Sequence, residues 1–180
     1  DTIEYRAHLR RSKRTVVRYE WRFDRDYAAV FVQLPLEGNL HVECLDATWA
    51  LLMELGLFEA RQDRLSLTAS VNALAEDRAN VTASGRTMRA EGGYVDFVST
   101  IPDRGIADIA ALRTVDQGID ASSFTSADGR FKLDDSLHAE LSRAVNLEVY
   151  GSERRMRIGV QCHRDDVYYL TDLIREKGRE

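Results

Sequence analysis

The sequence predicts an α+β fold with a mainly antiparallel sheet, on two observations. Several segments show the two-residue alternation of half-buried strands and follow one another with only short polar turns between them. The segments with helical periodicity stand between groups of strands, whereas a parallel α/β fold would alternate single strands with single helices. We therefore expect two antiparallel meanders and a C-terminal hairpin, with about four helices packed on the sheet.

The N-terminal third predicts a meander followed by a helix. Residues 15–23 alternate apolar and charged side chains, and residues 27–34 form a nearly continuous apolar strand. Residues 40–45 predict a third strand. Asp46 is suited to cap a helix that runs to Leu57, because its carboxylate can accept the free N–H groups of a first turn. This helix is apolar almost all round, so we expect it to be buried on more than one side.

The middle of the chain predicts a second meander. Residues 64–74 alternate as a strand does, although residues 71–76 fit a short helix equally well. Strands are expected near 80–90 and 94–101, joined by a turn at the glycines that follow Glu91.

The last part of the chain predicts helices, a loop and a hairpin. Asp103 and either Asp134 or Asp135 are the expected N-caps of helices over residues 103–113 and 134–145. The residues between them, 114–128, show little periodicity and predict one long loop. A hairpin over residues 147–162 and a helix with an apolar stripe from 167 to 174 complete the pattern.

The composition predicts a single compact domain over residues 1–180. Only two prolines, Pro35 and Pro102, occur, and glycine and serine never cluster into a linker. The meanders suggest an internal duplication, which no residue-level repeat supports. The apolar runs are shorter than the roughly 18 residues that cross a bilayer. Two cysteines are fewer than a secreted disulfide scaffold uses, which favours a reduced, cytoplasmic protein.

The distribution of charge is the most informative feature of the sequence. The net charge is −5, but eight of the 25 basic and four of the 30 acidic residues fall within residues 1–25. This segment is therefore +4 and the remainder −9. The first interpretation of its basic residues is a solvated strand face that protects an edge strand. The others are a contact with an acidic protein or with a second copy of the chain, and a nucleic-acid surface, although the strand alternation turns the aromatic residues away from bases.

The residues expected to contact a partner come from three places. Trp49 and Met53 would anchor a contact made by the apolar helix. The basic residues expected to take part are Arg10, Arg11, Arg14, Arg18 and Arg22 near the N-terminus, and Arg154, Arg155 and Arg157 in the C-terminal hairpin.

Catalytic and metal motifs are weak. His41, Cys44, Cys162 and His163 supply the residue types of a zinc site, but residues one or three apart in a strand point to opposite faces. Asp165 and Asp166, beside His163, are better explained as caps of the last helix than as ligands of a divalent cation. A nucleophile elbow and a glycine-rich phosphate loop are both missing from the sequence, so we expect no cofactor.

These observations favour a non-catalytic binding or assembly protein that makes protein–protein contacts and forms oligomers. The alternative is a nucleic-acid-binding regulator that uses the N-terminal arginines and the hairpin around residues 154–157. A small metal-dependent enzyme that uses the acidic pairs near His163 is the third hypothesis.

Overall fold

The computed structural model describes residues 17–22, 27–32, 40–56, 66–101, 104–120, 123–159 and 161–179. The chain divides into two compact units, residues 1–63 and residues 64–180. The composition predicts that the two units fold as one domain, and a fragment experiment can test this prediction. None of the described helices is long and apolar enough to cross a membrane.

The first unit contains a hairpin and a helix. Strands β1 (Val17–Arg22) and β2 (Tyr27–Val32) pair antiparallel, as the alternation predicts, and α1 (Leu40–Glu54) packs against β2. The expected strand over 40–45 is wrong, because these residues form the first turns of α1. An apolar alternation of six residues is too short to separate a strand from a helix.

The path of α1 also corrects two further expectations. Asp46 lies exposed inside the helix and does not cap it. Leu52 is 6% exposed, whereas Leu51 and Leu55 are 53% and 61% exposed. The expected burial of α1 on more than one side is therefore wrong for Leu51 and Leu55. The expected helix end at Leu57 lies outside the described residues.

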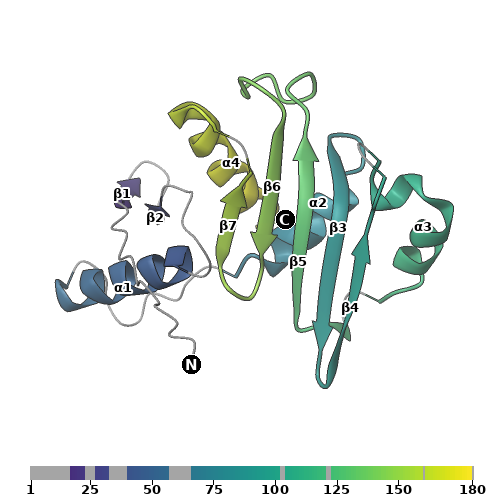
Figure 1. The fold of residues 1–180 in the computed structure, drawn as a ribbon, viewed down its shortest axis with the longest axis horizontal. Helices are drawn as coiled ribbons and strands as arrows, with labels where there is room; N and C mark the ends of the chain where they lie inside the picture. Colours follow the sequence, from purple (N-terminus) through teal and green to yellow (C-terminus); the bar gives the residue numbers. More distant parts are fainter. Residues whose placement is uncertain are drawn as a thin grey trace, which may run out of the picture. The chain divides into compact units, whose positions relative to one another are not determined.

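The second unit is built on a five-stranded antiparallel sheet with the order β4-β3-β5-β6-β7 (Figure 1). This sheet confirms the predicted α+β class. The strands, in sheet order, are β4 (Gly93–Val98), β3 (Val81–Ala90), β5 (Ser126–Leu133), β6 (Val145–Tyr150) and β7 (Arg155–Ile158). The predicted turn after Glu91 joins β3 to β4, and the predicted C-terminal hairpin is formed by β6 and β7.

Helices α2 (Thr68–Glu76) and α4 (Arg164–Lys177) bury the inner face of this sheet, and α2 contacts α4, β5 and β6. The strand expected over 64–74 is wrong within its described part, and the alternative of a short helix is correct. Three-residue spacing places Val71 and Leu74 on one side of α2, where both are fully buried. The main contributors to the core are Val71, Leu74, Met88, Phe131, Leu133, Val145, Leu147, Val149, Leu170 and Ile174.

The connection between β4 and β5 departs from the predicted helix and loop. The short 3-10 helix η1 (Ile106–Asp108) precedes α3 (Ala110–Gln117), so helical structure extends into the expected loop of 114–128. That loop also ends early, because β5 begins at Ser126. Asp103, the expected cap, lies outside the described residues.

The helix expected over 134–145 is wrong. Leu133 and Val145 pair directly between β5 and β6, so the intervening residues need only form a wide turn. Asp134 Oδ1 accepts hydrogen bonds from the backbone N–H and the hydroxyl of Ser136, at 3.0 and 2.8 Å. This local bonding satisfies the aspartate without a helix.

The buried His138 fixes this turn to its surroundings. Its Nε2–H donates to the carbonyl of Asn80 at 2.9 Å, so Nδ1 accepts from the hydroxyl of Tyr169 at 2.7 Å. Because Tyr169 belongs to α4, one imidazole connects the β5–β6 turn, the residue before β3 and the C-terminal helix.

Candidate binding surface

The outer face of the five-stranded sheet lies opposite the face that α2 and α4 cover. Alternation directs Phe131 and Leu147 inward and their strand neighbours outward. We define the outer face as the side chains that this alternation directs away from α2 and α4. All of them are exposed or half-buried except Ser126, which is buried. They are Thr82, Thr87, Arg89, Tyr94, Asp96, Val98, Ser126, Asp128, Arg130, Lys132, Asn146, Glu148, Tyr150, Arg155 and Arg157.

Charged side chains of the outer face meet across neighbouring strands. Arg89 Nη2 lies 3.5 Å from Asp128 Oδ2, and Arg157 Nη1 lies 3.6 Å from Glu148 Oε2. The side chains of these two arginines are 52% and 53% exposed. Such exposed pairs contribute little to folding and leave the guanidinium groups accessible to a partner.

Arg130 occupies the middle strand of this face. The register places it opposite Gly85 on β3 and opposite Glu148 on β6. A Cβ on Gly85 would lie 3.2 Å from Arg130 Cδ, so the glycine leaves room for the aliphatic part of the arginine to cross β3. Within the described parts of the chain, the guanidinium of Arg130 makes no hydrogen bond or ion pair. It is therefore a cation available to a ligand.

An arginine and a tyrosine stack at the β6–β7 end of the outer face. The guanidinium of Arg155 lies 4.1 Å from the ring centroid of Tyr150, whose hydroxyl donates to Glu148 Oε2 at 2.6 Å. Burial, together with the Glu148 carboxylate, raises the pKa of Tyr150, so its hydroxyl stays protonated as a donor near neutral pH.

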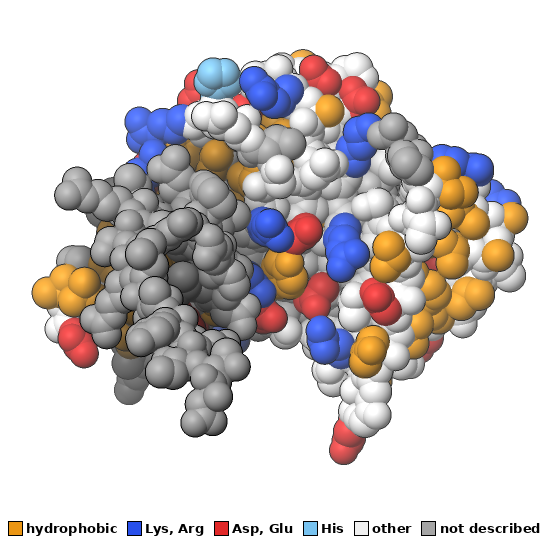
Figure 2. Space-filling model, viewed as in Figure 1, with side chains coloured by type: hydrophobic (Ala, Val, Ile, Leu, Met, Phe, Trp, Pro, Cys, Tyr) orange, Lys and Arg blue, Asp and Glu red, His pale blue; other side chains and the backbone are white. Residues whose placement is uncertain are grey.

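The outer face is more basic than the chain as a whole. It carries five basic side chains and three acidic ones, whereas the chain has a net charge of −5. Figure 2 shows basic and acidic groups interspersed over these strands. This basic surface belongs to the second unit, and apart from Arg155 and Arg157 its residues differ from those that the sequence singles out.

Apolar side chains are exposed along β4, at the edge of the outer face. Tyr94 and Val98 on β4 are 69% and 37% exposed, and Ile101, three residues after Val98, is 44% exposed. Figure 2 shows apolar groups on this side of the second unit. We call these three residues the apolar flank. Grouped exposed apolar residues beside polar ones are typical of protein interaction sites.

The structure brings two of the predicted partner-binding arginines to the outer face. Arg155 and Arg157 project from β7, and Arg154 lies exposed in the preceding turn with a φ of 56°. A positive φ is uncommon for a residue with a side chain.

The predicted residues of the first unit do not form a described cluster. Arg18 pairs with Glu20 at 2.8 Å and lies 5.0 Å from the ring centroid of Phe31. Trp49 and Met53 are half-buried on α1, and their role as anchors stays a prediction. Arg10, Arg11, Arg14 and the side chain of Arg22 lie outside the described residues.

Sequence reasoning missed Arg89, Tyr94 and Arg130. The alternation of residues 126–133 favours a strand with Arg130 on its polar face, but the predicted loop over 114–128 includes the first residues of this strand. The pairing of β5 with β3, which puts Arg130 opposite Gly85, joins residues 45 positions apart and has no local signal.

The residues proposed for metal binding are engaged elsewhere or separated. In the described part of the chain, no three His, Cys, Asp or Glu residues form a group that could hold a metal ion. Cys44 and Cys162 are both free thiols, and they belong to different units. Burial, with the Asp166 carboxylate, raises the pKa of Cys162 and keeps its thiol protonated. The side chain of His41 lies outside the described residues.

Asp166 acts as a helix cap, as the sequence predicts. Its carboxylate accepts hydrogen bonds from the backbone N–H of His163 at 2.8 Å and from the backbone N–H and hydroxyl of Ser142 at 2.8 and 2.7 Å. Burial by itself raises the pKa of Asp166, but these hydrogen bonds outweigh it and leave the pKa below its ordinary value.

Comparisons of the chain with protein-family models, with curated proteins and with solved structures gave no match. Its function is therefore argued from the geometry and charge of its own surface.

Proposed function

We propose that this chain is a non-catalytic binding protein that receives an acidic protein surface on the outer face of its five-stranded sheet. The observation that carries the proposal is the position of Arg130. Its guanidinium lies without a partner among the described residues, between the exposed Arg89 and Arg157 and beside the apolar flank.

The combination of cations with aliphatic side chains favours a protein over other polyanions. Carboxylates of a partner would pair with the arginines, while its apolar side chains would cover Val98 and Ile101. A phosphate backbone would use the arginines but would leave these two aliphatic groups in water. A second copy of this chain, with its net charge of −5, is one acidic partner of this kind, so the proposal includes self-association.

A nucleic-acid function is the second candidate, and one contact favours it. Tyr94 and Arg89 are paired residues on β4 and β3, and Tyr94 is 69% exposed. An open ring beside an exposed guanidinium could stack on a base while the cation binds the adjacent phosphate.

Charge reversal at Arg130 tests the proposal. A fluorescent peptide that contains glutamate and leucine, and a single-stranded DNA oligonucleotide, are titrated separately with the full chain and followed by fluorescence anisotropy. We expect Arg130→Glu to weaken peptide binding about tenfold or more, because like charges would then meet across the interface. The matched control, Arg143→Glu, makes the same charge change at an exposed residue outside this face and should leave binding unchanged.

A second variant separates the two candidates. Val98→Ser removes an aliphatic contact without changing charge, so it should weaken peptide binding and spare oligonucleotide binding. Light scattering at increasing concentrations of the chain tests a second copy as the partner. Tighter binding of the oligonucleotide, unaffected by Val98→Ser, would support the nucleic-acid candidate instead. Binding to neither probe, with a monomer at every concentration, would contradict the proposal.

A further inference from the structure

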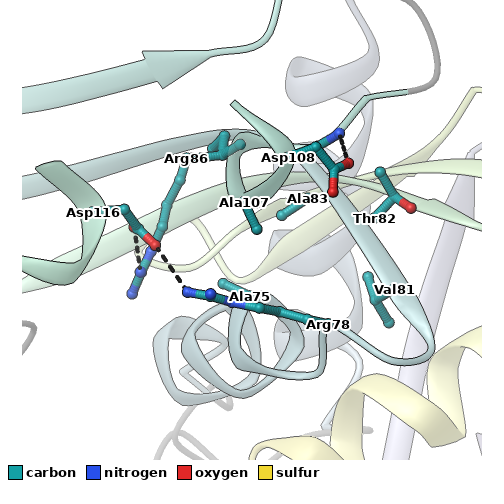
Figure 3. A pocket seen from close by; sticks show the side chains of 11 residues that line it. Ala75, Arg78, Val81, Thr82, Ala83, Arg86, Ala107, Asp108 and Asp116 are labelled. Atoms are coloured by element: carbon teal, nitrogen blue, oxygen red, sulfur yellow. Dashed lines mark hydrogen bonds and ion pairs between the residues drawn. The ribbon is translucent and has the colours of Figure 1, made fainter. Parts of the chain in front are cut away.

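A partly enclosed cavity of about 90 Å³ lies between α2, β3, η1 and α3 (Figure 3). All of its lining residues belong to the second unit, and none is part of the outer face except Thr82 at its edge. What the cavity could bind is independent of the function proposed above.

One end of the cavity is formed by two arginines around one carboxylate. Arg86 Nη1 donates to Asp116 Oδ1 at 3.2 Å, and Arg78 Nη2 lies 3.7 Å from Asp116 Oδ2 (Figure 3). Arg86 is only 8% exposed, and its Nη2 donates to Asn72 Oδ1 at 2.7 Å. Arg86 on β3 therefore binds Asp116 on α3 and Asn72 on α2, and these hydrogen bonds hold both helices against the strand.

Hydrogen-bond donors outnumber acceptors at this end. A guanidinium has five N–H donors and no acceptor. Among the described residues, the buried Nε–H of Arg86 has no acceptor, and the contact of Arg78 with Asp116 is too long for a hydrogen bond. A ligand that fits must therefore bring acceptors, and a carboxylate matches the planar fork of a guanidinium.

The middle of the cavity is apolar. Figure 3 places the methyl groups of Ala75, Ala83 and Ala107 between the arginines and the opposite end, which Thr82 and Asp108 form. The ligand should therefore carry a short apolar body behind its anionic group.

Charge and volume limit the ligand further. The two guanidinium groups share the single carboxylate of Asp116, whereas Asp108, at the opposite end, is exposed and its Oδ2 accepts the backbone N–H of Gly105 at 2.8 Å. The arginine end therefore carries one positive charge more than Asp116 balances, which a monoanion compensates and a dianion would exceed. Because a dry cavity of roughly 150 Å³ holds benzene, about 90 Å³ suits only a few heavy atoms. We propose that this cavity binds a short-chain monocarboxylate of the size of propionate.

Titration of the ¹⁵N-labelled full chain with sodium propionate, followed by NMR chemical shifts, tests the proposal. We expect saturable shifts at the amides of Ala75, Ala83 and Ala107, with a dissociation constant on the order of millimolar, given the few atoms of the ligand. Sodium chloride at the same ionic strength and the neutral analogue propionamide should not reproduce these shifts. Equal shifts with either compound would overturn the proposal, since they would show screening or binding without a carboxylate.

Two variants locate the site. Arg86→Lys keeps the charge beside Asp116 but removes the fork, and Ala107→Leu fills the cavity with every charge retained. Each should weaken propionate binding about tenfold or more. The matched control, Arg89→Lys, makes the same exchange on the outer face of the same strand and should bind propionate as the unaltered chain does. Unchanged binding in Ala107→Leu, whose fold is checked by the dispersion of its spectrum, would overturn the cavity as the site.

Discussion

At the scale of single residues, Asp166 is a buried carboxylate whose hydrogen bonds stabilise the fold. It is 1% exposed and accepts three hydrogen bonds from Ser142 and His163, which join the start of α4 to the turn before β6. Asp166→Asn removes the negative charge and part of the accepting capacity. We expect a loss of about 2 kcal/mol in the free energy of unfolding at pH 7, measured with urea.

The same residue predicts a pH dependence. The pKa of Asp166 is lower in the folded chain than the ordinary value near 3.9, so the unfolded chain binds the proton more tightly. Its contribution is therefore complete above about pH 4 and is lost as the pH falls through the folded pKa. The difference between the unaltered chain and Asp166→Asn should shrink over that range.

The neighbouring Asp165 supplies the control. It lies exposed in the same first turn of α4, so Asp165→Asn should cost only a few tenths of a kcal/mol. Equal losses for the two variants would show that helix-dipole effects, and not the buried hydrogen bonds, account for the stability that Asp166 contributes.

At the scale of elements, β5 depends on a glycine beside its largest buried side chain. A Cβ on Gly129 would collide with the ring of Phe131, which is 1% exposed. Gly129→Ala must therefore displace this ring within a packed core. We expect it to lower the free energy of unfolding by about 2 kcal/mol, again measured with urea.

Gly93, at the start of β4, is the matched control for this substitution. A Cβ there would meet no atom within 4 Å, so Gly93→Ala should leave stability nearly unchanged. If Gly129→Ala were as mild as Gly93→Ala, the core around Phe131 would have to be loose enough to absorb the added methyl group.

The type of an element was predictable only where its periodic pattern was long or where a turn signal supported the pattern. The turn after Glu91, with a strand expected on each side of it, identified the first hairpin of the sheet, and the stripe through Leu170 identified α4. The strands predicted over residues 40–45 and 68–70 are wrong because short apolar runs fit both periodicities, whereas the helix offered as an alternative over 71–76 is correct. The turn after Asp134 was misread because an aspartate satisfies a local turn as well as a helix cap.

At the scale of the whole molecule, the described core cluster lies entirely within residues 64–180. We expect a fragment of these residues to fold alone, because it retains the five-stranded sheet and both helices that cover its inner face. Circular dichroism with urea should show one cooperative transition close to that of the full chain.

This experiment also tests the predicted single domain. A fragment that unfolds without cooperativity, or at a much lower urea concentration, would show that residues 1–63 complete the fold. Phe131→Ala in the fragment is the control, since removing the central core ring should abolish or strongly weaken the cooperative transition.

The sequence alone determined the α+β class, the inward faces of β4, β6 and β7, the cap at Asp166 and the uneven distribution of charge. These features depend on residues close together in the chain. Only the tertiary structure decided that Arg130 lies opposite Gly85 and Glu148, and that Arg78, Arg86 and Asp116 meet at one cavity. Strand order and register join distant residues through backbone pairing and core packing, and neither leaves a periodic signal along the chain.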